Sequence, residues 1–211
     1  MSDDSLLPTD AEIVAAAARH ARESRERRWE TPQVPQVPQV ESGFPILHHN
    51  QPVAWVKWGG VPHILEGEAA TQAYVYEMLH ENPALLEFIR VPEVYRIIQI
   101  DEFPRVLVVM EYVHGRTVRR CLEGETTDES RDRLWSQILC ALNTLLSFQP
   151  PPNTAPGPAG GGGISHMIFG EYCEHETAPR DFNSVQDLEN FINLTIVRFQ
   201  LYFTYDIKQL T

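Results

Sequence analysis

A lysine within an apolar run is the residue of this chain best placed to do chemistry. Lys57 lies near the end of a run that starts at Val53 and has the composition of a β-strand. Because side chains alternate between faces along a strand, Val53, Trp55 and Lys57 are expected to share one face. An ammonium group among large apolar side chains needs an anionic partner or loses its proton. Glu68, in the helix predicted to follow, can supply that charge, and Glu66 is the other candidate. A lysine that extends into solvent from an edge strand is the alternative interpretation.

The elements around Lys57 are expected in the order strand, strand, helix, strand, strand. Apolar and β-branched runs bounded by turn residues predict the strands, and a helical stripe of Ala, Tyr and Met predicts the helix. In chain order these elements are Pro45–His49, Val53–Trp58, Leu65–Glu81, Val94–Asp101 and Arg105–Val113. The apolar insertion Asn82–Arg90 is expected to add one short helical turn. The sequence therefore predicts an α+β lobe with an antiparallel sheet and one helix.

Four short segments of this lobe carry a resemblance to a known family. They are Val56-Lys57-Trp58-Gly59, Glu68-Ala69, Val91-Pro92-Glu93-Val94-Tyr95 and Val108-Val109-Met110-Glu111-Tyr112-Val113-His114-Gly115-Arg116-Thr117. Together they resemble the aminoglycoside phosphotransferase/choline kinase-like family. That family has a protein-kinase-like fold and transfers the γ-phosphoryl group of ATP to a hydroxyl of a small molecule. The resemblance covers roughly residues 44–205.

The resemblance implies a nucleotide site with ATP and Mg²⁺ as cofactors. Lys57 would hold the α- and β-phosphates, and Glu68 would pair with Lys57. Met110 would back the adenine ring, and the backbone of Glu111 and Val113 would hydrogen-bond its edge. No residue of this chain is assigned as a metal ligand or as a catalytic group.

The chain departs from the family pattern at two places. A glycine-rich phosphate loop normally precedes the lysine strand, but only Gly43 precedes Lys57, and Gly59 and Gly60 follow it. The catalytic loop His-x-Asp-x-x-x-x-Asn is also missing, because no Asp after Thr127 has Asn five positions later. We therefore expect an inactive or incomplete family member, truncated before the catalytic loop. The alternatives are a non-catalytic nucleotide-binding or scaffolding module, and an interaction protein that uses its N-terminal segment.

Composition narrows the classes of partner. The 211 residues suffice for one domain or two small lobes, and the net charge of −12 disfavours a nucleic-acid or anionic-membrane surface. Cys121, Cys140 and Cys173 lack metal-ligand spacing and are expected to be reduced thiols, which favours a cytoplasmic protein. Neither a signal peptide nor a membrane-spanning run is visible in the sequence.

The N-terminal segment, residues 1–40, is expected to be a helix and a linker that pack little against the rest. Thr9 and Glu12 predict a capping box for a helix over residues 10–29. Three copies of Pro-Gln-Val in residues 32–40 predict a polyproline II spacer, with a ligand for a proline-reading domain as the alternative. The nucleotide lobe would then be residues 41–115, followed by part of a helical lobe over 116–211.

A long helix is predicted from a capping box at Thr126 and Glu129 to about Phe148. Its apolar residues form two neighbouring stripes, one of Leu134, Ile138, Ala141, Leu145 and Phe148, the other of Trp135, Leu139, Leu142 and Leu146. Stripes of that width predict a helix buried on most sides. If part of this lobe is missing, the exposed apolar surface would favour self-association. A last helix is expected to begin at Ser184 with Asp187 in its capping box.

Overall fold

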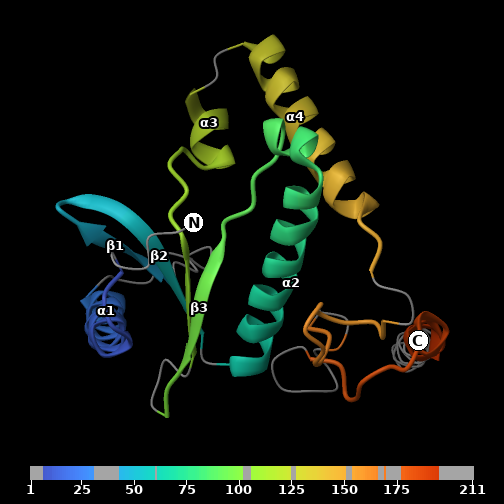
Figure 1. Ribbon diagram of the computed structural model, residues 1–211, viewed down its shortest axis with the longest axis horizontal. Coiled ribbons are helices and arrows are strands. Elements are labelled where there is room, and N and C mark those ends of the chain that lie inside the picture. The colour runs from blue at the N-terminus through green and yellow to red at the C-terminus, as the bar shows by residue number, and fades with distance from the viewer. Residues whose placement is uncertain are drawn as a thin grey trace, which may run out of the picture. The chain divides into compact units, whose positions relative to one another are not determined.

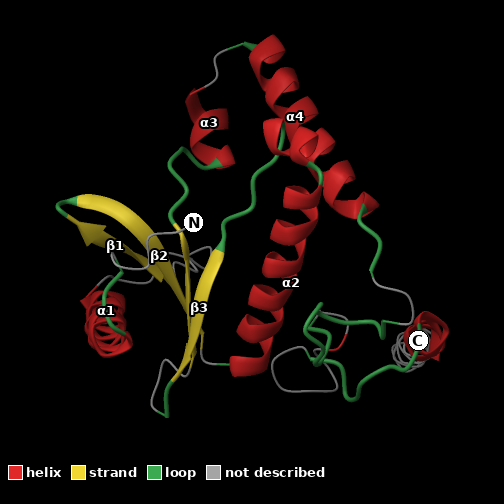
Figure 2. Cartoon of the chain, in the orientation of Figure 1, coloured by secondary structure: helices red, strands yellow, loops and turns green. Residues whose placement is uncertain are grey.

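The computed structural model describes residues 7–30, 43–59, 61–101, 106–124, 127–150, 154–165, 169 and 177–194. The chain divides into two compact units, Met1–Gln149 and Pro150–Thr211. The first unit contains helices and an antiparallel sheet (Figures 1 and 2), so the predicted α+β class is confirmed. Within the described residues, no helix combines the length and apolar composition needed to cross a membrane. The Pro-Gln-Val repeat lies outside the described residues.

The sheet has four antiparallel strands in the order β1-β2-β4-β3. The strands are β1 (Gly43–His48), β2 (Gln51–Gly59), β3 (Val94–Gln99) and β4 (Val106–Glu111). All four predicted strands are therefore present, and β3 and β4 each end two residues earlier than expected. The β1–β2 turn is shorter than predicted, because His49 and Asn50 alone form it with φ of 49° and 61°. Positive φ at both central residues is the geometry of a two-residue turn that matches strand twist.

A bulge in β2 changes which side chains lie beside Lys57. The pairing register shifts next to Ile46, which leaves Val53 as an extra residue in β2. Val53 consequently packs against the cluster that contains Ala54, whereas Trp55 packs against the cluster on the opposite face. The prediction that Val53 shares the face of Trp55 and Lys57 is therefore wrong.

Helix α2 (Pro62–Glu81) covers one face of the sheet. Its Leu65 and Ala69 are buried against Val106, Val108 and Met110 of β4. The helix begins three residues before the predicted start, because Pro62 occupies its first turn, where a missing N–H costs nothing. The 3-10 helix η2 (Pro83–Glu87) supplies the short turn expected after it.

Helix α1 (Asp10–Glu30) covers the other face of the sheet, so the prediction that residues 1–40 pack little is wrong for this helix (Figure 1). Ile13 and Ala17 are almost fully buried in the cluster formed by that face. Arg96 of β3 also donates a hydrogen bond from Nη1 to Asp10 Oδ1 at 2.8 Å. The physical reason is that the sheet is apolar on both faces, and an apolar face requires cover. The capping box of Thr9 is confirmed, because the Thr9 N–H donates to Glu12 Oε2 at 2.9 Å and Thr9 Oγ1 accepts from the Glu12 N–H at 3.4 Å.

Two helices follow the sheet, α3 (Val118–Gly124) and α4 (Asp128–Ser147). Thr127 caps α4 by accepting a hydrogen bond from the Ser130 N–H at 3.2 Å, one residue later than predicted. No residue of α4 is buried, so the expectation of a helix buried on most sides is wrong. One predicted stripe is half-buried, and the other is exposed along its whole length: Trp135, Leu139, Leu142 and Leu146.

The second unit has a small core of its own. Phe169, Ala178 and Phe182 are buried together. Residues 185–194 are helical, and Ser184 Oγ accepts a hydrogen bond from the Asp187 N–H at 3.1 Å. The predicted start of the last helix is therefore confirmed.

Candidate functional site

Lys57 and Glu68 form an ion pair between Nζ and Oε1, as the sequence predicted. Lys57 belongs to β2 and Glu68 to the second turn of α2, so the contact joins the sheet to the helix that covers it. The two side chains are 33% and 48% exposed. Solvent therefore screens the attraction, and its contribution to stability is small. The same exposure leaves the ammonium group accessible to an anionic ligand.

Glu66, the other candidate partner of Lys57, contacts a different strand. Its Oε1 accepts a hydrogen bond from Gln99 Nε2 of β3 at 2.5 Å. The two carboxylates, two residues apart on α2, thus have separate partners in β2 and β3. The structure assigns the ion pair to Glu68.

Met110 lies on the same sheet face as Lys57. In the pairing of β2 with β4, Lys57 lies opposite Val108 and Trp55 lies opposite Met110. Paired residues in antiparallel strands project to one face, and this face is the one under α2. Met110 is nearly buried, with 9% of its surface exposed. Lys57, Glu68 and Met110 are therefore brought together on one side of the sheet.

Gln72 is a residue of this site that sequence reasoning missed. Its Nε2 donates to the Pro92 carbonyl at 2.8 Å and contacts Met110 Sδ at 3.7 Å. Gln72 lies four residues after Glu68, and that helical spacing, which places both on one face of α2, was the available signal. The amide therefore fixes the position of the thioether.

Glu111 and Val113 lie at the end of β4 and just beyond it. The Glu111 N–H donates to the Glu93 carbonyl at 2.8 Å, so this N–H is already used within the sheet. Val113 is 63% exposed and follows the last strand residue by two positions. Val113 is therefore largely open to solvent, and its side chain is not part of the cluster around Met110.

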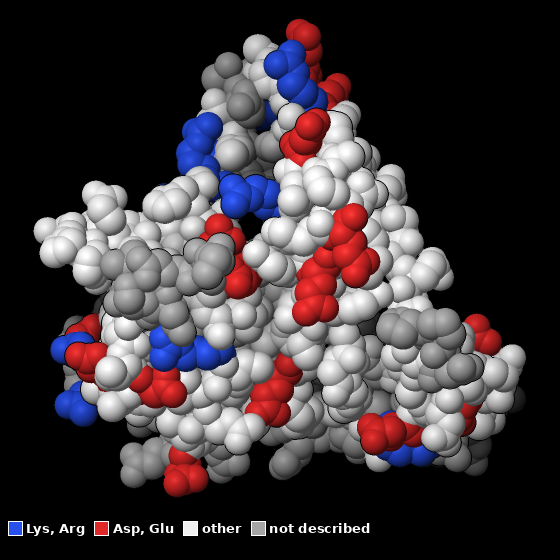
Figure 3. Space-filling model, in the orientation of Figure 1, with Lys and Arg blue, Asp and Glu red and all other residues white. Residues whose placement is uncertain are grey.

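Charges on the face of the molecule drawn in Figure 3 are mixed. Lys and Arg side chains stand there in separate small groups among Asp and Glu. No group of three or more His, Cys, Asp and Glu in the described part of the chain is arranged to hold a metal ion. The described residues therefore do not form a metal site of their own.

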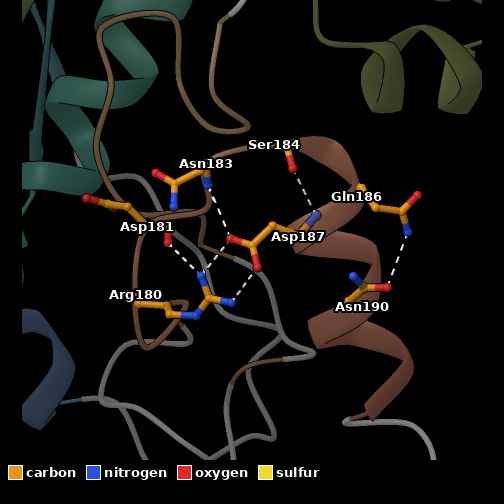
Figure 4. Close-up of polar contacts among 7 residues, drawn as sticks. All are labelled: Arg180, Asp181, Asn183, Ser184, Gln186, Asp187 and Asn190. Atoms are coloured by element: carbon orange, nitrogen blue, oxygen red, sulfur yellow. Dashed lines mark hydrogen bonds and ion pairs between the residues drawn. The ribbon is translucent and has the colours of Figure 1, made fainter.

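A second group of polar contacts lies in the second unit and centres on Arg180 (Figure 4). Its Nη1 and Nη2 donate to Asp187 Oδ2 and Oδ1 at 2.8 and 2.7 Å. The pKa of Asp187 is lowered to about 2, chiefly by these hydrogen bonds from Arg180; burial opposes the shift, and the Asn183 N–H and the charge of Arg180 contribute to it. The guanidinium also lies 4.6 Å above the Phe182 ring. Because both charged groups are satisfied within the unit, we interpret this arrangement as a clamp on the helix start.

No protein-family model, curated protein or solved structure matches this chain. The functional argument therefore depends on the residues and their geometry.

Proposed function

We propose that residues 43–113 form a nucleotide-binding lobe of the aminoglycoside phosphotransferase type. The observation that carries this proposal is the ion pair between Lys57 and Glu68, which joins β2 to α2. An unpaired lysine samples many rotamers, and a fixed carboxylate restricts its ammonium group to one region. In kinase-type sites a lysine held in this way binds the phosphates of ATP.

The adenine ring would lie near Met110 at the end of the sheet. Met110 offers an apolar, polarizable surface, and Gln72 holds its thioether in place. The carbonyl of Glu111 would accept a hydrogen bond from the adenine amino group. The backbone of Val113 would hydrogen-bond the same edge of the adenine ring. The pair of Lys57 and Val108 is the next pair after Trp55 and Met110 on the same sheet face, so one nucleotide could contact both Met110 and Lys57.

Mg²⁺ would accompany the nucleotide, as the family resemblance implies. ATP supplies a transferable γ-phosphoryl group when it is bound. The 211 residues lack the His-x-Asp-x-x-x-x-Asn motif, so we propose nucleotide binding without efficient transfer. An acceptor base contributes on the order of 10²–10⁴ in rate. Turnover of ATP near ~1 s⁻¹ by purified residues 1–211 would contradict this part of the proposal.

Calorimetric titration with a non-hydrolysable ATP analogue and Mg²⁺ tests the site. Lys57→Met should weaken binding by about tenfold or more, because it removes a charge-assisted contact to phosphate. Arg119→Met is the matched control, because Arg119 is an exposed cation of α3 that pairs only with Glu123 in the contacts described. Unchanged affinity in Lys57→Met would remove Lys57 from the site.

A second pair of variants tests the role of the ion pair. Glu68→Gln should weaken analogue binding severalfold, whereas Glu66→Gln, two residues away on α2, should leave it unchanged. Both variants remove one negative charge, so a general electrostatic effect would change the two affinities equally. An equal effect would show that the Glu68 contact does not position Lys57.

A further inference from the structure

A cavity of about 480 Å³ lies at the C-terminal half of α2, apart from the Lys57 contact. Its walls come from α2, η2, the segment before β3 and the ends of β3 and β4. Only Glu111 is shared with the proposed nucleotide site, to which it contributes backbone. The volume falls within the range of small-molecule pockets.

Two tyrosines and three aliphatic residues form the apolar part of this cavity. Leu79 is fully buried behind the wall, and the half-buried side chains of Leu86 and Val91 and the rings of Tyr76 and Tyr95 line the space. Aromatic faces carry partial negative charge and attract cations. The apolar lining therefore suits a ligand that combines hydrocarbon with a positive charge.

Two carboxylates, Glu93 and Glu111, line the same cavity. One oxygen of Glu111 accepts from the Glu93 N–H at 3.4 Å and the other lies 3.5 Å from Arg90 Nη2, so both contacts are long. Burial raises the pKa of the Tyr76 phenol, and the charges of Glu93 and Glu111 and a hydrogen bond to Glu93 raise it further. The pKa of Tyr95 is raised by burial and then by the same two carboxylates. The share of both shifts that comes from the two carboxylates places negative charge near the phenols, and the charge of Arg90 opposes it at Tyr76.

Arg90 is the one lining residue with a permanent positive charge, and it holds Glu111 loosely. Its side chain is 80% exposed and its contact with Glu111 is longer than a normal hydrogen bond. The Arg90 guanidinium therefore lies near the Glu111 carboxylate, but its side chain stays mostly in solvent. A better-placed cation can replace it at small cost, because an exposed ion pair contributes little.

We propose that this cavity binds an organic cation, a protonated amine or guanidinium group that lies between Tyr76 and Tyr95 and pairs with Glu93 and Glu111. The hydrocarbon part of the ligand would contact Leu86 and Val91, which also line the cavity. The group can belong to a free small molecule or to a Lys or Arg side chain of a peptide, since both present the same chemistry. Neither source depends on nucleotide binding, so the failure of one proposal does not decide the other.

Matched ligands test the charge requirement in the full 211-residue chain. Titration with 2-phenylethylammonium should show binding at least about tenfold tighter than titration with 2-phenylethanol, which has the same shape without the charge. An acetylated and amidated Ala-Lys-Ala peptide, compared with its norleucine counterpart, tests the peptide source. Saturable binding of either cation supports the proposal and identifies the source. The proposal is overturned if each cation binds no more tightly than its neutral counterpart. It is also overturned if neither cation binds at millimolar concentration.

Variants locate the binding within the cavity. The double variant Glu93→Gln and Glu111→Gln keeps the acceptor oxygens and should weaken cation binding by about tenfold or more. Glu87→Gln is the matched control, because Glu87 is an exposed carboxylate of η2 that does not line the cavity. Arg90→Gln should strengthen binding severalfold by removing the competing guanidinium. Thermal unfolding verifies that each variant is folded, and unchanged affinity in a folded double variant would overturn the assignment.

Discussion

The sheet and α4 both carry apolar side chains at regular spacing, yet only the sheet buries them. Residues 106–110 of β4 are all buried, whereas α4 has no buried residue. β4 is a central strand with α2 on one face and α1 on the other. The comparison teaches that periodicity predicts which element forms, but burial requires a second element to cover the stripe.

The exposed stripe of α4 has the character of a contact surface. Leu139 is 57% and Leu146 is 80% exposed, and soluble proteins rarely leave large apolar side chains contiguous and uncovered. Self-association through this stripe stays a proposal. Sedimentation velocity over a range of protein concentrations tests this proposal. If the stripe forms the contact, the Leu142→Glu variant should associate less than the unaltered chain at the same concentration.

The largest expected effect is a difference in the free energy of unfolding between two leucine-to-alanine variants, one in the sheet and one in α4. Leu107→Ala removes a fully buried side chain of β4 and should lower the free energy of unfolding by about 2–5 kcal/mol. Leu142→Ala, on the exposed stripe of α4, should change it by no more than about 0.5 kcal/mol. Urea unfolding of the two variants measures the difference. Similar losses would mean that α4 is covered by a partner in solution.

A smaller loss is expected where α1 meets the sheet. Ile13→Ala should lower the free energy of unfolding by about 2 kcal/mol, near the lower limit for such truncations, because a single helix can shift to fill the space. Ala15→Ser, at an exposed position of the same helix, is the control. Urea unfolding again gives the comparison. No loss in Ile13→Ala would mean that α1 leaves the sheet in solution, as the sequence alone predicted.

The smallest effect should appear in the acid stability of the second unit. Asp187 has a folded pKa of about 2 against an ordinary value of 3.8, so its stabilising contribution is complete above 3.8 and is lost as pH falls through about 2. Asp187→Asn should therefore remove part of the fall in stability over that interval. Acid unfolding of the full chain, followed by circular dichroism, measures the slope. Glu189→Gln, which removes one charge from the same helix, is the control, and equal slopes in both variants would contradict the role of the clamp.

Much of the secondary structure in both units could be predicted from local pattern. The strand runs, the helix over Lys57 and the capping residues Thr9 and Ser184 depend on neighbours within a few positions, so the sequence contains the needed information. The Lys57–Glu68 pair was also predictable, because strand alternation and helix spacing limit which acid can reach the ammonium group. The bulge at Val53 was not, because it depends on the register with β1.

By itself the sequence determined the order of the elements and the α+β class, and it reduced the partners expected beside Lys57 to two acids, Glu68 and Glu66. Only the tertiary structure decided that α1 covers the rear of the sheet, that α4 keeps one stripe exposed, and that Gln72 fixes Met110. The same packing also formed the cavity between Tyr76 and Tyr95, whose residues come from separate elements. The physical reason is that hydrogen bonding and side-chain spacing within an element are local, whereas burial is a property of pairs of surfaces distant in sequence.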